Sequence, residues 1–221
     1  MSLLIRPRHH PRFRRVLEDS FRLRREVFVD GLGWPLPHAR RTAGTGLEYD
    51  DFDGNAATYL VNLNSVSHVM ATVRMTPSTA PNLTCDSLAG QMGIVMPRGS
   101  HIVEMSRMCA DPRLSREERR ETMLELRACA GLLFLDNGWT HSIGVGYDHH
   151  IQPFIRSGMT VEILGPPVIF PGDSEPSFAI LATDPDRPAR VAQMIAGRPP
   201  RLQDPDRDSS LFARYGDRAV A

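Results

Sequence analysis

Apolar positions recur with helical spacing in three stretches of the chain. An imperfect apolar stripe among arginines predicts a helix over residues 12–30, and residues 31–37, with two glycines and two prolines, are predicted to be irregular. A capping box that begins at Ser115 predicts a long helix, which ends at the Asn-Gly pair of residues 137–138. A shorter helix is predicted over residues 148–157.

Runs of apolar and β-branched residues predict the strands. They cover residues 58–63, 66–75, 101–109, 139–145, 160–164 and 178–183. Antiparallel strands that alternate with helices predict an α/β (α+β) fold with a mixed central sheet flanked by helices. We expect a single domain over residues 1–184 and a loosely held tail, rich in Pro, Arg and Asp, over residues 185–221.

The composition is that of an ordinary globular protein. The chain has 221 residues, of which 41% are apolar and 24% charged, which suits one domain. It has no run of about 20 apolar residues and no apolar leader, so we expect a cytoplasmic protein that does not span a membrane. The three cysteines lack paired spacing, which argues against disulfides and against a zinc site, and no metal site is expected.

The charges are unevenly distributed although they sum to zero. All 26 basic residues are arginines, which excludes a Schiff-base lysine and a P-loop lysine. Residues 1–41 hold ten arginines and four acidic residues, a balance of +6. A basic segment of this kind indicates either a docking site for an anionic partner or a solvated surface.

Two clusters in the first half could carry chemistry. Arg24 and Phe28 lie four residues apart and would share a helix face, with Trp34 shortly after them. Residues 48–53 hold four carboxylates, among them Asp50 and Asp53. This acidic segment fits a solvated loop, a metal site or a cradle for a cationic ligand, although its spacing is not that of a calcium loop.

Two predicted strands also carry charge. Arg74 lies in an apolar strand and would need a carboxylate partner if buried, which Asp50 or Asp53 could supply. Glu104, Ser106 and Arg107 lie in another apolar strand. Alternation places Glu104 and Arg107 on opposite faces, so a β-bulge must lie between them if both serve one cleft.

The sequence has no GxSxG, HExxH or Cys–His motif. The chemistry that remains is substrate positioning with a general base, and a purely structural ion-pair network explains the charged residues nearly as well.

Taken in order, these motifs resemble the LuxI-type autoinducer synthase (N-acyl-homoserine lactone synthase) family over roughly residues 20–110. The resemblance rests on Arg24-x-x-x-Phe28, Trp34, Glu48-x-Asp50-x-Phe52-Asp53, Arg74 with Pro77, and Glu104-x-Ser106-Arg107. It implies a GNAT-like fold, like that of the N-acetyltransferases. It also implies an acyltransferase that acylates S-adenosylmethionine from an acyl thioester and closes the product to an N-acyl-L-homoserine lactone, releasing methylthioadenosine.

The resemblance also implies roles for the site residues. Glu104 is expected to act as the base, while Asp50 and Asp53 hold the cationic part of the substrate or brace arginines. Arg74 and Arg107 are expected to anchor a carboxylate or orient these acids. The expected substrate-binding residues are Arg24, Phe28, Trp34 and Ser106.

Partners and alternatives follow from the same comparison. S-adenosylmethionine is a substrate, so no cofactor is expected, and the basic segment favours acyl carrier protein over coenzyme A as the acyl carrier. Residues 144–150 depart from the family pattern, which leaves the acyl chain open. The alternatives are a GNAT-type acyl-CoA N-acyltransferase, although residues 108–112 lack its glycine-rich loop, and a non-catalytic acyl-ligand sensor. A nucleic-acid partner is not expected, because acids are mixed with the arginines and no recognition motif is present.

Overall fold

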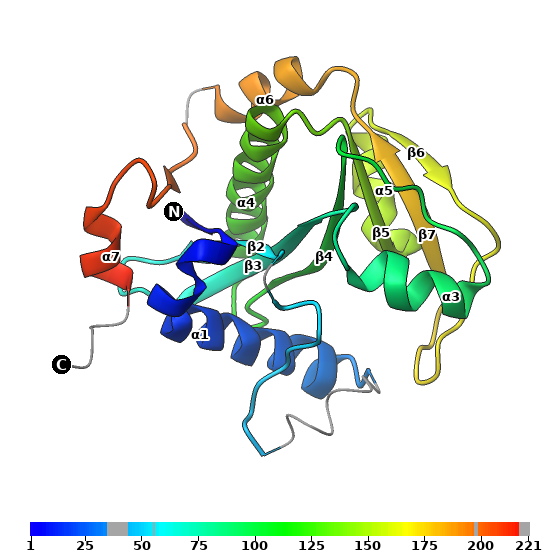
Figure 1. Ribbon diagram of the computed structural model, residues 1–221, viewed down its shortest axis with the longest axis horizontal. Coiled ribbons are helices and arrows are strands. Elements are labelled where there is room, and N and C mark those ends of the chain that lie inside the picture. The colour runs from blue at the N-terminus through cyan, green and yellow to red at the C-terminus, as the bar shows by residue number, and fades with distance from the viewer. Residues whose placement is uncertain (35–43, 55, 197–198, 217–221) are drawn as a thin grey trace.

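The protein is built on an eight-stranded mixed sheet with the strand order β6-β7-β5-β4-β3-β2-β1-β8 (Figure 1). The computed structural model describes residues 1–34, 44–54, 56–196 and 199–216. Neighbouring strands are antiparallel except for the parallel pairs β4–β5 and β1–β8. The strands are β1 (Ser2–Ile5), β2 (Thr58–Leu63), β3 (Val69–Pro77), β4 (Ile102–Ala110), β5 (His141–Tyr147), β6 (Thr160–Ile163), β7 (Ser177–Thr183) and β8 (Leu202–Gln203).

All strands predicted from the sequence are present, with their ends shifted by a few residues. The predicted α/β fold with a mixed central sheet flanked by helices is therefore confirmed. The strands β1 and β8 were not predicted. They are short, and their pairing partners lie far away in the sequence, so that no local pattern marks them.

The three predicted helices begin and end close to the predicted positions, whereas the helical segments at residues 7–12, 84–92, 187–195 and 210–215 were not predicted. Ser115 and Glu118 form the reciprocal capping box, and Gly138 ends the long helix with a φ of 66°. The helix predicted over residues 12–30 is an α-helix over Arg14–Arg24 that continues directly as a π-helix over Arg25–Gly31, and a separate 3-10 helix over Pro7–Arg12 precedes it. The helical segments are η1 (Pro7–Arg12), α1 (Arg14–Arg24), η2 (Arg25–Gly31), η3 (Thr84–Leu88), α3 (Ala89–Met92), α4 (Arg116–Asn137), α5 (Asp148–Arg156), α6 (Arg187–Ile195) and α7 (Ser210–Tyr215).

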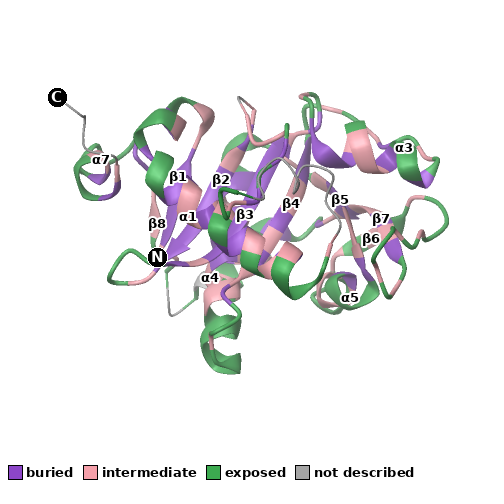
Figure 2. Ribbon diagram, turned by 90° about the horizontal axis from the view of Figure 1, so that it is seen from below, coloured by how far each residue is buried: buried purple, intermediate pink, exposed green. Residues whose placement is uncertain are grey.

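Helices cover both faces of the sheet, because apolar residues alternate along its strands. In β1, Leu3 and Ile5 pack with α1 in one core cluster, whereas Leu4 packs with α4 in another. Figure 2 shows α4 and α5 on one side of the sheet and α3 on the other. The covered sheet places the side chains of β3 and β4 between helices, where a charged group is stable only with partners.

The parallel strands β4 and β5 pair over a short stretch only. Residues 102–104 of β4 pair with residues 141–143 of β5. Beyond Glu104, β4 continues along β3 and β5 continues along β7, so that the two strands diverge (Figure 2). Glu104 therefore lies at the point where the sheet opens.

The expectation of a loosely held tail is wrong for the described part of residues 185–221. The strand β8 pairs with β1, and Leu211 and Tyr215 of α7 are buried in the same cluster as Phe13. Arg6 also binds Asp204 through two nitrogens, at 2.6 and 3.0 Å. The segment has few apolar residues, but Leu211 and Tyr215 are among those that pack into the core. Composition alone does not predict this packing. The domain boundary at residue 184 stays a prediction.

Within the described ranges, no helix is both long and apolar enough to cross a bilayer. In the same residues, Cys85, Cys109 and Cys129 are free thiols, and no three His, Cys, Asp or Glu side chains gather in a way that could hold a metal ion.

Candidate active site

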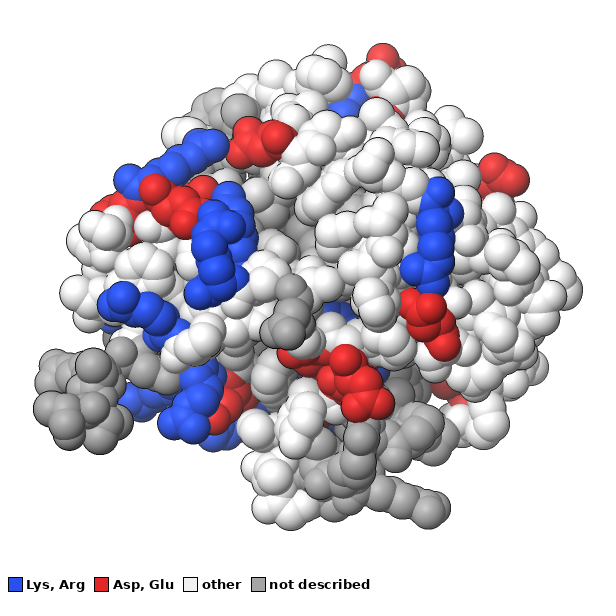
Figure 3. Space-filling view, viewed as in Figure 1, with Lys and Arg blue, Asp and Glu red and all other residues white. Residues whose placement is uncertain are grey.

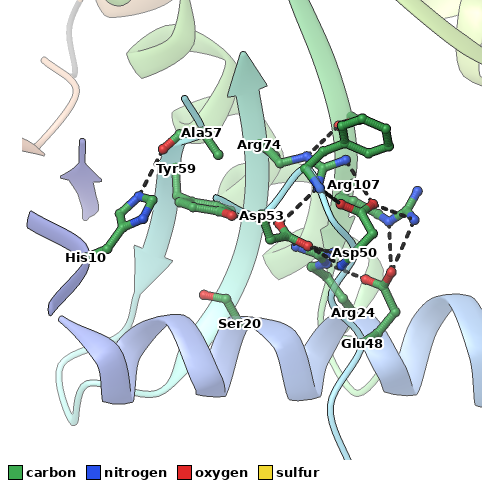
Figure 4. A network of polar contacts seen from close by, with 12 residues as sticks. His10, Ser20, Arg24, Glu48, Asp50, Asp53, Ala57, Tyr59, Arg74 and Arg107 are labelled. Carbon is green, nitrogen blue, oxygen red and sulfur yellow. Dashed lines mark hydrogen bonds and ion pairs between the residues drawn. The ribbon is translucent and has the colours of Figure 1, made fainter. Parts of the chain in front are cut away.

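Arg24, the last residue of α1, is buried and binds two acidic residues (Figure 4). Its Nε donates to Glu48 Oε2 at 2.5 Å, and its two terminal nitrogens donate to the two oxygens of Asp53 at 2.7 Å each. The Phe21 ring lies 4.9 Å from the guanidinium carbon. Arg24 therefore attaches the acidic segment at residues 48–53 to the end of α1.

Arg74 of β3 and Arg107 of β4 bind the same acidic segment. Arg74 donates to both oxygens of Asp50, at 2.5 and 3.1 Å, and lies 3.0 Å from Asp53 Oδ1. Arg107 donates to Glu48 Oε1 at 3.1 Å and to Asp50 Oδ2 at 3.2 Å. The arginine–carboxylate network comprises Arg24, Arg74, Arg107, Glu48, Asp50 and Asp53. Its charges balance, and this compensation is what allows all six side chains to be buried.

A β-bulge brings Arg107 into this network, as the sequence required. Thr72 pairs with Cys109 and Arg74 pairs with Ser106, so two residues of β4 stand opposite the single residue Val73 of β3. Arg107 has a φ of 54°, which is costly for a residue with a side chain. The bulge turns Arg107 toward the face that carries Ser106 and Glu104.

The network holds Arg74 and Asp53 ionised against the effect of burial. Burial opposes the charge of Arg74, but Asp53, Asp50 and Glu104 outweigh it and hold the pKa of Arg74 above its ordinary value. Burial likewise favours neutral Asp53, but Arg24 and Arg74 keep the pKa of this carboxyl well below its usual range. Tyr59 adds a hydrogen bond, since its hydroxyl donates to Asp53 Oδ1 at 2.6 Å.

Glu104 lies next to the network and is fully buried. The Ser106 hydroxyl accepts from Arg74 Nε at 3.0 Å and donates to Glu104 Oε2 at 3.1 Å, while Thr84 donates to Glu104 Oε1 at 3.2 Å. Burial raises the pKa of Glu104, and Arg74 with these hydrogen bonds offsets the effect only in part. A buried carboxyl with a raised pKa at the opening of a sheet has the properties of a general base.

Aromatic residues form the other side of the site. Phe28 is buried, and the Trp34 ring stacks on it with centroids 4.9 Å apart and planes inclined by 18°. The guanidinium carbon of Arg107 lies 5.7 Å from the centre of the Phe28 ring. The Trp34 indole nitrogen donates to the Tyr147 hydroxyl at 2.8 Å.

The structure brings all the predicted site residues into one connected set. Asp50 and Asp53 engage arginines, which is one of the two arrangements that the sequence allowed. Sequence reasoning missed Thr84, Tyr59 and Tyr147 as contacts of the site. Glu48 was visible in the acidic segment but was not assigned a role.

The mixed sheet, which opens between its parallel central strands, gives the protein a GNAT-like fold, and a buried acid lies at the opening. The sequence model of the autoinducer synthases matches residues 9–169, and the chain belongs to the autoinducer synthase family.

Individual relatives are similar over parts of their length. An acyl-homoserine-lactone synthase of Pseudomonas fluorescens is 35% identical over 95 residues, which cover 42% of this chain and 47% of that protein. The chain thus matches about half the length of this curated relative. The synthase of Ralstonia solanacearum is 28% identical over 152 residues, which cover 65% of this chain and 71% of that protein.

Solved structures share the fold. BjaI, a CoA-dependent acyl-homoserine lactone synthase solved with SAM and isopentyl-CoA, superposes with a TM-score of 0.74 and covers 92% of both chains. Its sequence identity with this chain is 24%, so this likeness concerns the fold alone.

Proposed function

We propose that this protein transfers an acyl group from a thioester to the amine of S-adenosylmethionine and then closes the product to an N-acyl-L-homoserine lactone. The observation that carries the proposal is the connection from Asp50 through Arg74 and Ser106 to the buried Glu104. It couples a rigid, ionised network to one carboxyl group that is suited to accept a proton.

The first step forms the amide. The methionyl amine must be neutral to attack the thioester carbonyl, and Glu104 takes the proton, directly or through one water. The C–N bond forms and the C–S bond of the thioester breaks. The attacking nitrogen gives up a second proton as it becomes an amide, and this proton goes to the departing thiolate. Glu104 is regenerated by releasing the ammonium proton to solvent. Arg74 orients Glu104 by fixing the Ser106 hydroxyl, whose single proton points to the carboxylate.

The second step forms the lactone. The carboxylate of the acylated substrate attacks its own γ-carbon, and methylthioadenosine leaves as a neutral thioether. This step needs no protein nucleophile, because the sulfonium is already an excellent leaving group. Neither step transfers electrons, so the chemistry requires no redox cofactor.

The aromatic side of the site binds the cationic substrate in this proposal. Trp34 presents a π-face to the sulfonium or the adenine, at roughly 0.5–2 kcal/mol for a cation–π contact, and Phe28 supports the indole by stacking on it. Asp50 and Asp53 are occupied by arginines and act by holding the site in shape.

For the acyl carrier, we propose acyl carrier protein, on the strength of the basic segment at residues 1–41. BjaI, by contrast, is CoA-dependent. The two carriers share the phosphopantetheine thioester, so the chemistry at Glu104 is the same for both. We place the reaction in the cytoplasm, where both substrates are produced.

The test is a reconstituted reaction. Purified protein, S-adenosylmethionine and an acyl thioester should yield lactone, methylthioadenosine and free thiol in equal amounts, as measured by mass spectrometry. An acylated product without lactone or methylthioadenosine would identify a plain N-acyltransferase. Binding of both substrates without turnover would identify a sensor.

A further inference from the structure

Tyr147 lies at the end of β5, where this strand has diverged from β4. It is buried, and its hydroxyl is shared by two elements that are distant in the sequence. The Trp34 indole nitrogen donates to this hydroxyl at 2.8 Å, and the hydroxyl donates to Asp173 Oδ1 at 2.8 Å. Tyr147 thereby joins the segment after η2 to the loop between β6 and β7.

The direction of both hydrogen bonds is fixed by chemistry. An indole N–H can only donate and a carboxylate can only accept, so the Tyr147 hydroxyl must accept from Trp34 and donate to Asp173. Burial and the bond to Asp173 raise the pKa of Tyr147 to about 12, so the phenol keeps its proton at neutral pH. The negative charge of Asp173 polarises this hydroxyl and strengthens the bond that it accepts from Trp34.

The neighbours of Tyr147 keep it in place. Its ring stacks on His150 of α5, with centroids 5.5 Å apart and planes inclined by 27°. Asp173 is aimed by a tight turn, in which its backbone nitrogen donates to the Phe170 carbonyl at 2.9 Å and Gly172 has a φ of 90°. The position of the hydroxyl is thus set by α5 and by the β6–β7 loop, independently of Trp34.

The contacts of Trp34 also lead back to the arginine–carboxylate network. Arg107 lies over Phe28, Phe28 stacks on Trp34, and Trp34 binds Tyr147. These side chains form a bridge from β4 to β5 on the side where the two strands have separated. Stacking on Phe28 alone would leave the indole free to rotate in its plane, whereas the bond to Tyr147 fixes that rotation.

We propose that Tyr147 is a positioning residue that fixes the Trp34 indole for S-adenosylmethionine. This inference rests on the proposed function, because it assigns Trp34 to that substrate. Tyr147 does not need to touch either substrate, and it acts only through the orientation of the indole.

The decisive variant is Tyr147→Phe, which removes the hydroxyl and keeps the ring that stacks on His150. The dissociation constant and the KM for S-adenosylmethionine should rise about tenfold, which corresponds to one hydrogen bond. The KM for the acyl thioester and the kcat should change less than twofold. Asp173→Asn should shift the same constants in the same direction but less, because an amide oxygen still accepts. The matched control is Tyr215→Phe in α7, which removes a hydroxyl that donates to Met1 Sδ at 3.4 Å, and it should change none of these constants.

A spectroscopic readout tests the contact without turnover. The chain has two tryptophans, so Trp139→Phe leaves Trp34 as the sole indole fluorophore. In that background, Tyr147→Phe should shift the Trp34 emission and lower its anisotropy, while thermal unfolding stays unchanged. Unaltered emission together with unaltered affinity for S-adenosylmethionine would overturn the proposal, as would an equal rise in both KM values. If the wild-type protein bound no S-adenosylmethionine, the proposed function would fail, whereas the emission shift would still report whether Tyr147 orients Trp34.

Discussion

Arg74 binds Asp50 through both terminal nitrogens while its third nitrogen binds Ser106. One side chain thus connects the acidic segment to the hydroxyl that contacts Glu104. A lysine could not make these three directed bonds, because it offers one nitrogen where arginine offers a planar fork. The geometry of Glu104 therefore depends on groups that do not touch it.

The substitutions Asp50→Asn and Asp53→Asn should each reduce activity and stability much more than Asp51→Asn. Each of the first two removes one of the three negative charges that balance the three buried arginines, and an uncompensated buried charge costs about 3–5 kcal/mol. Asp51 is exposed, and its substitution should have little effect. Urea unfolding and turnover of the three variants measure the difference. Equal losses from all three would indicate that the segment is only a solvated acidic loop.

The stability of the protein should fall steeply in acid. The pKa of Asp53 is depressed in the folded state, so its contribution is present above the ordinary value of 3.8 and is lost as the pH falls toward the folded-state value. Urea midpoints recorded from pH 6 to pH 2 should decrease below about pH 4. Asp53→Asn should begin with a lower midpoint and lose less of it over this range. A parallel decline in both proteins would assign the acid sensitivity to other groups.

Glu104→Gln should reduce turnover by about 10²–10⁴-fold and leave the protein folded. The amide keeps the shape of the side chain and an oxygen that accepts from one of the two hydroxyls, while its nitrogen can donate to the other, but it cannot take a proton. In the wild type, the acid limb of kcat against pH should lie above the ordinary glutamate value of 4.5, because burial raises the pKa of Glu104. The limb should vanish in the variant. Near-wild-type turnover at saturating substrate would remove Glu104 from the mechanism.

Leu211→Ala should destabilise the protein by about 2–5 kcal/mol, because Leu211 is buried in the core although it lies in the C-terminal segment. A suitable control is Leu124→Ala, since Leu124 is 43% exposed on α4. The midpoint of urea unfolding measures both effects. If the two variants were equally stable, α7 would contribute no packing energy in solution.

With one acyl group on each carrier, turnover should be faster from acyl carrier protein than from coenzyme A. Changing Arg14 and Arg15 to glutamate should raise the KM for the carrier protein and leave that for S-adenosylmethionine unchanged. Rates should fall with salt, since association over a basic surface is screened beyond about 8–10 Å. A faster reaction from the coenzyme A thioester would overturn this assignment.

Acidic side chains neutralise part of the basic segment at residues 1–41, on which the preference for acyl carrier protein rests. Arg6 and Arg8 bind Asp206, and Arg24 belongs to the buried network. Figure 3 shows acidic side chains among the basic ones over the region where α1 and α7 lie in Figure 1. Arg40 and Arg41 lie outside the described residues. The effect of reversing Arg14 and Arg15 therefore measures how much of the basic surface remains available to a partner.

The strands and the site residues on them could be predicted because each carries a local signal. Arg74 is a single charge in an apolar strand, and its need for a carboxylate partner pointed to the acidic segment. Glu104 stands out as the one acid of its apolar strand. The bulge at Arg107 followed from placing an acid and a base of one strand in one site. Tyr147 offered no such signal, because a tyrosine at the end of a strand is ordinary and its partner Trp34 lies 113 residues away.

The C-terminal segment shows a different limit of sequence reasoning. Its composition is typical of a flexible tail, and only the contacts of Asp204, Leu211 and Tyr215 with distant residues determine that it is folded. The strand β8 has two residues and exists because β1 lies beside it. Such short elements form through contacts with the rest of the folded domain, and the hydrophobic pattern of their own residues does not predict them.

The cations of the buried network are all arginines, and in the proposed reaction this choice protects the protein from its own acyl donor. A buried lysine readily loses its proton, and the resulting amine would attack an acyl thioester and become permanently acylated. A guanidinium stays protonated and does not compete. Since the whole chain lacks lysine, no ε-amine anywhere on it can be acylated by a reactive thioester, and the amine of the small-molecule substrate meets no rival from a lysine side chain.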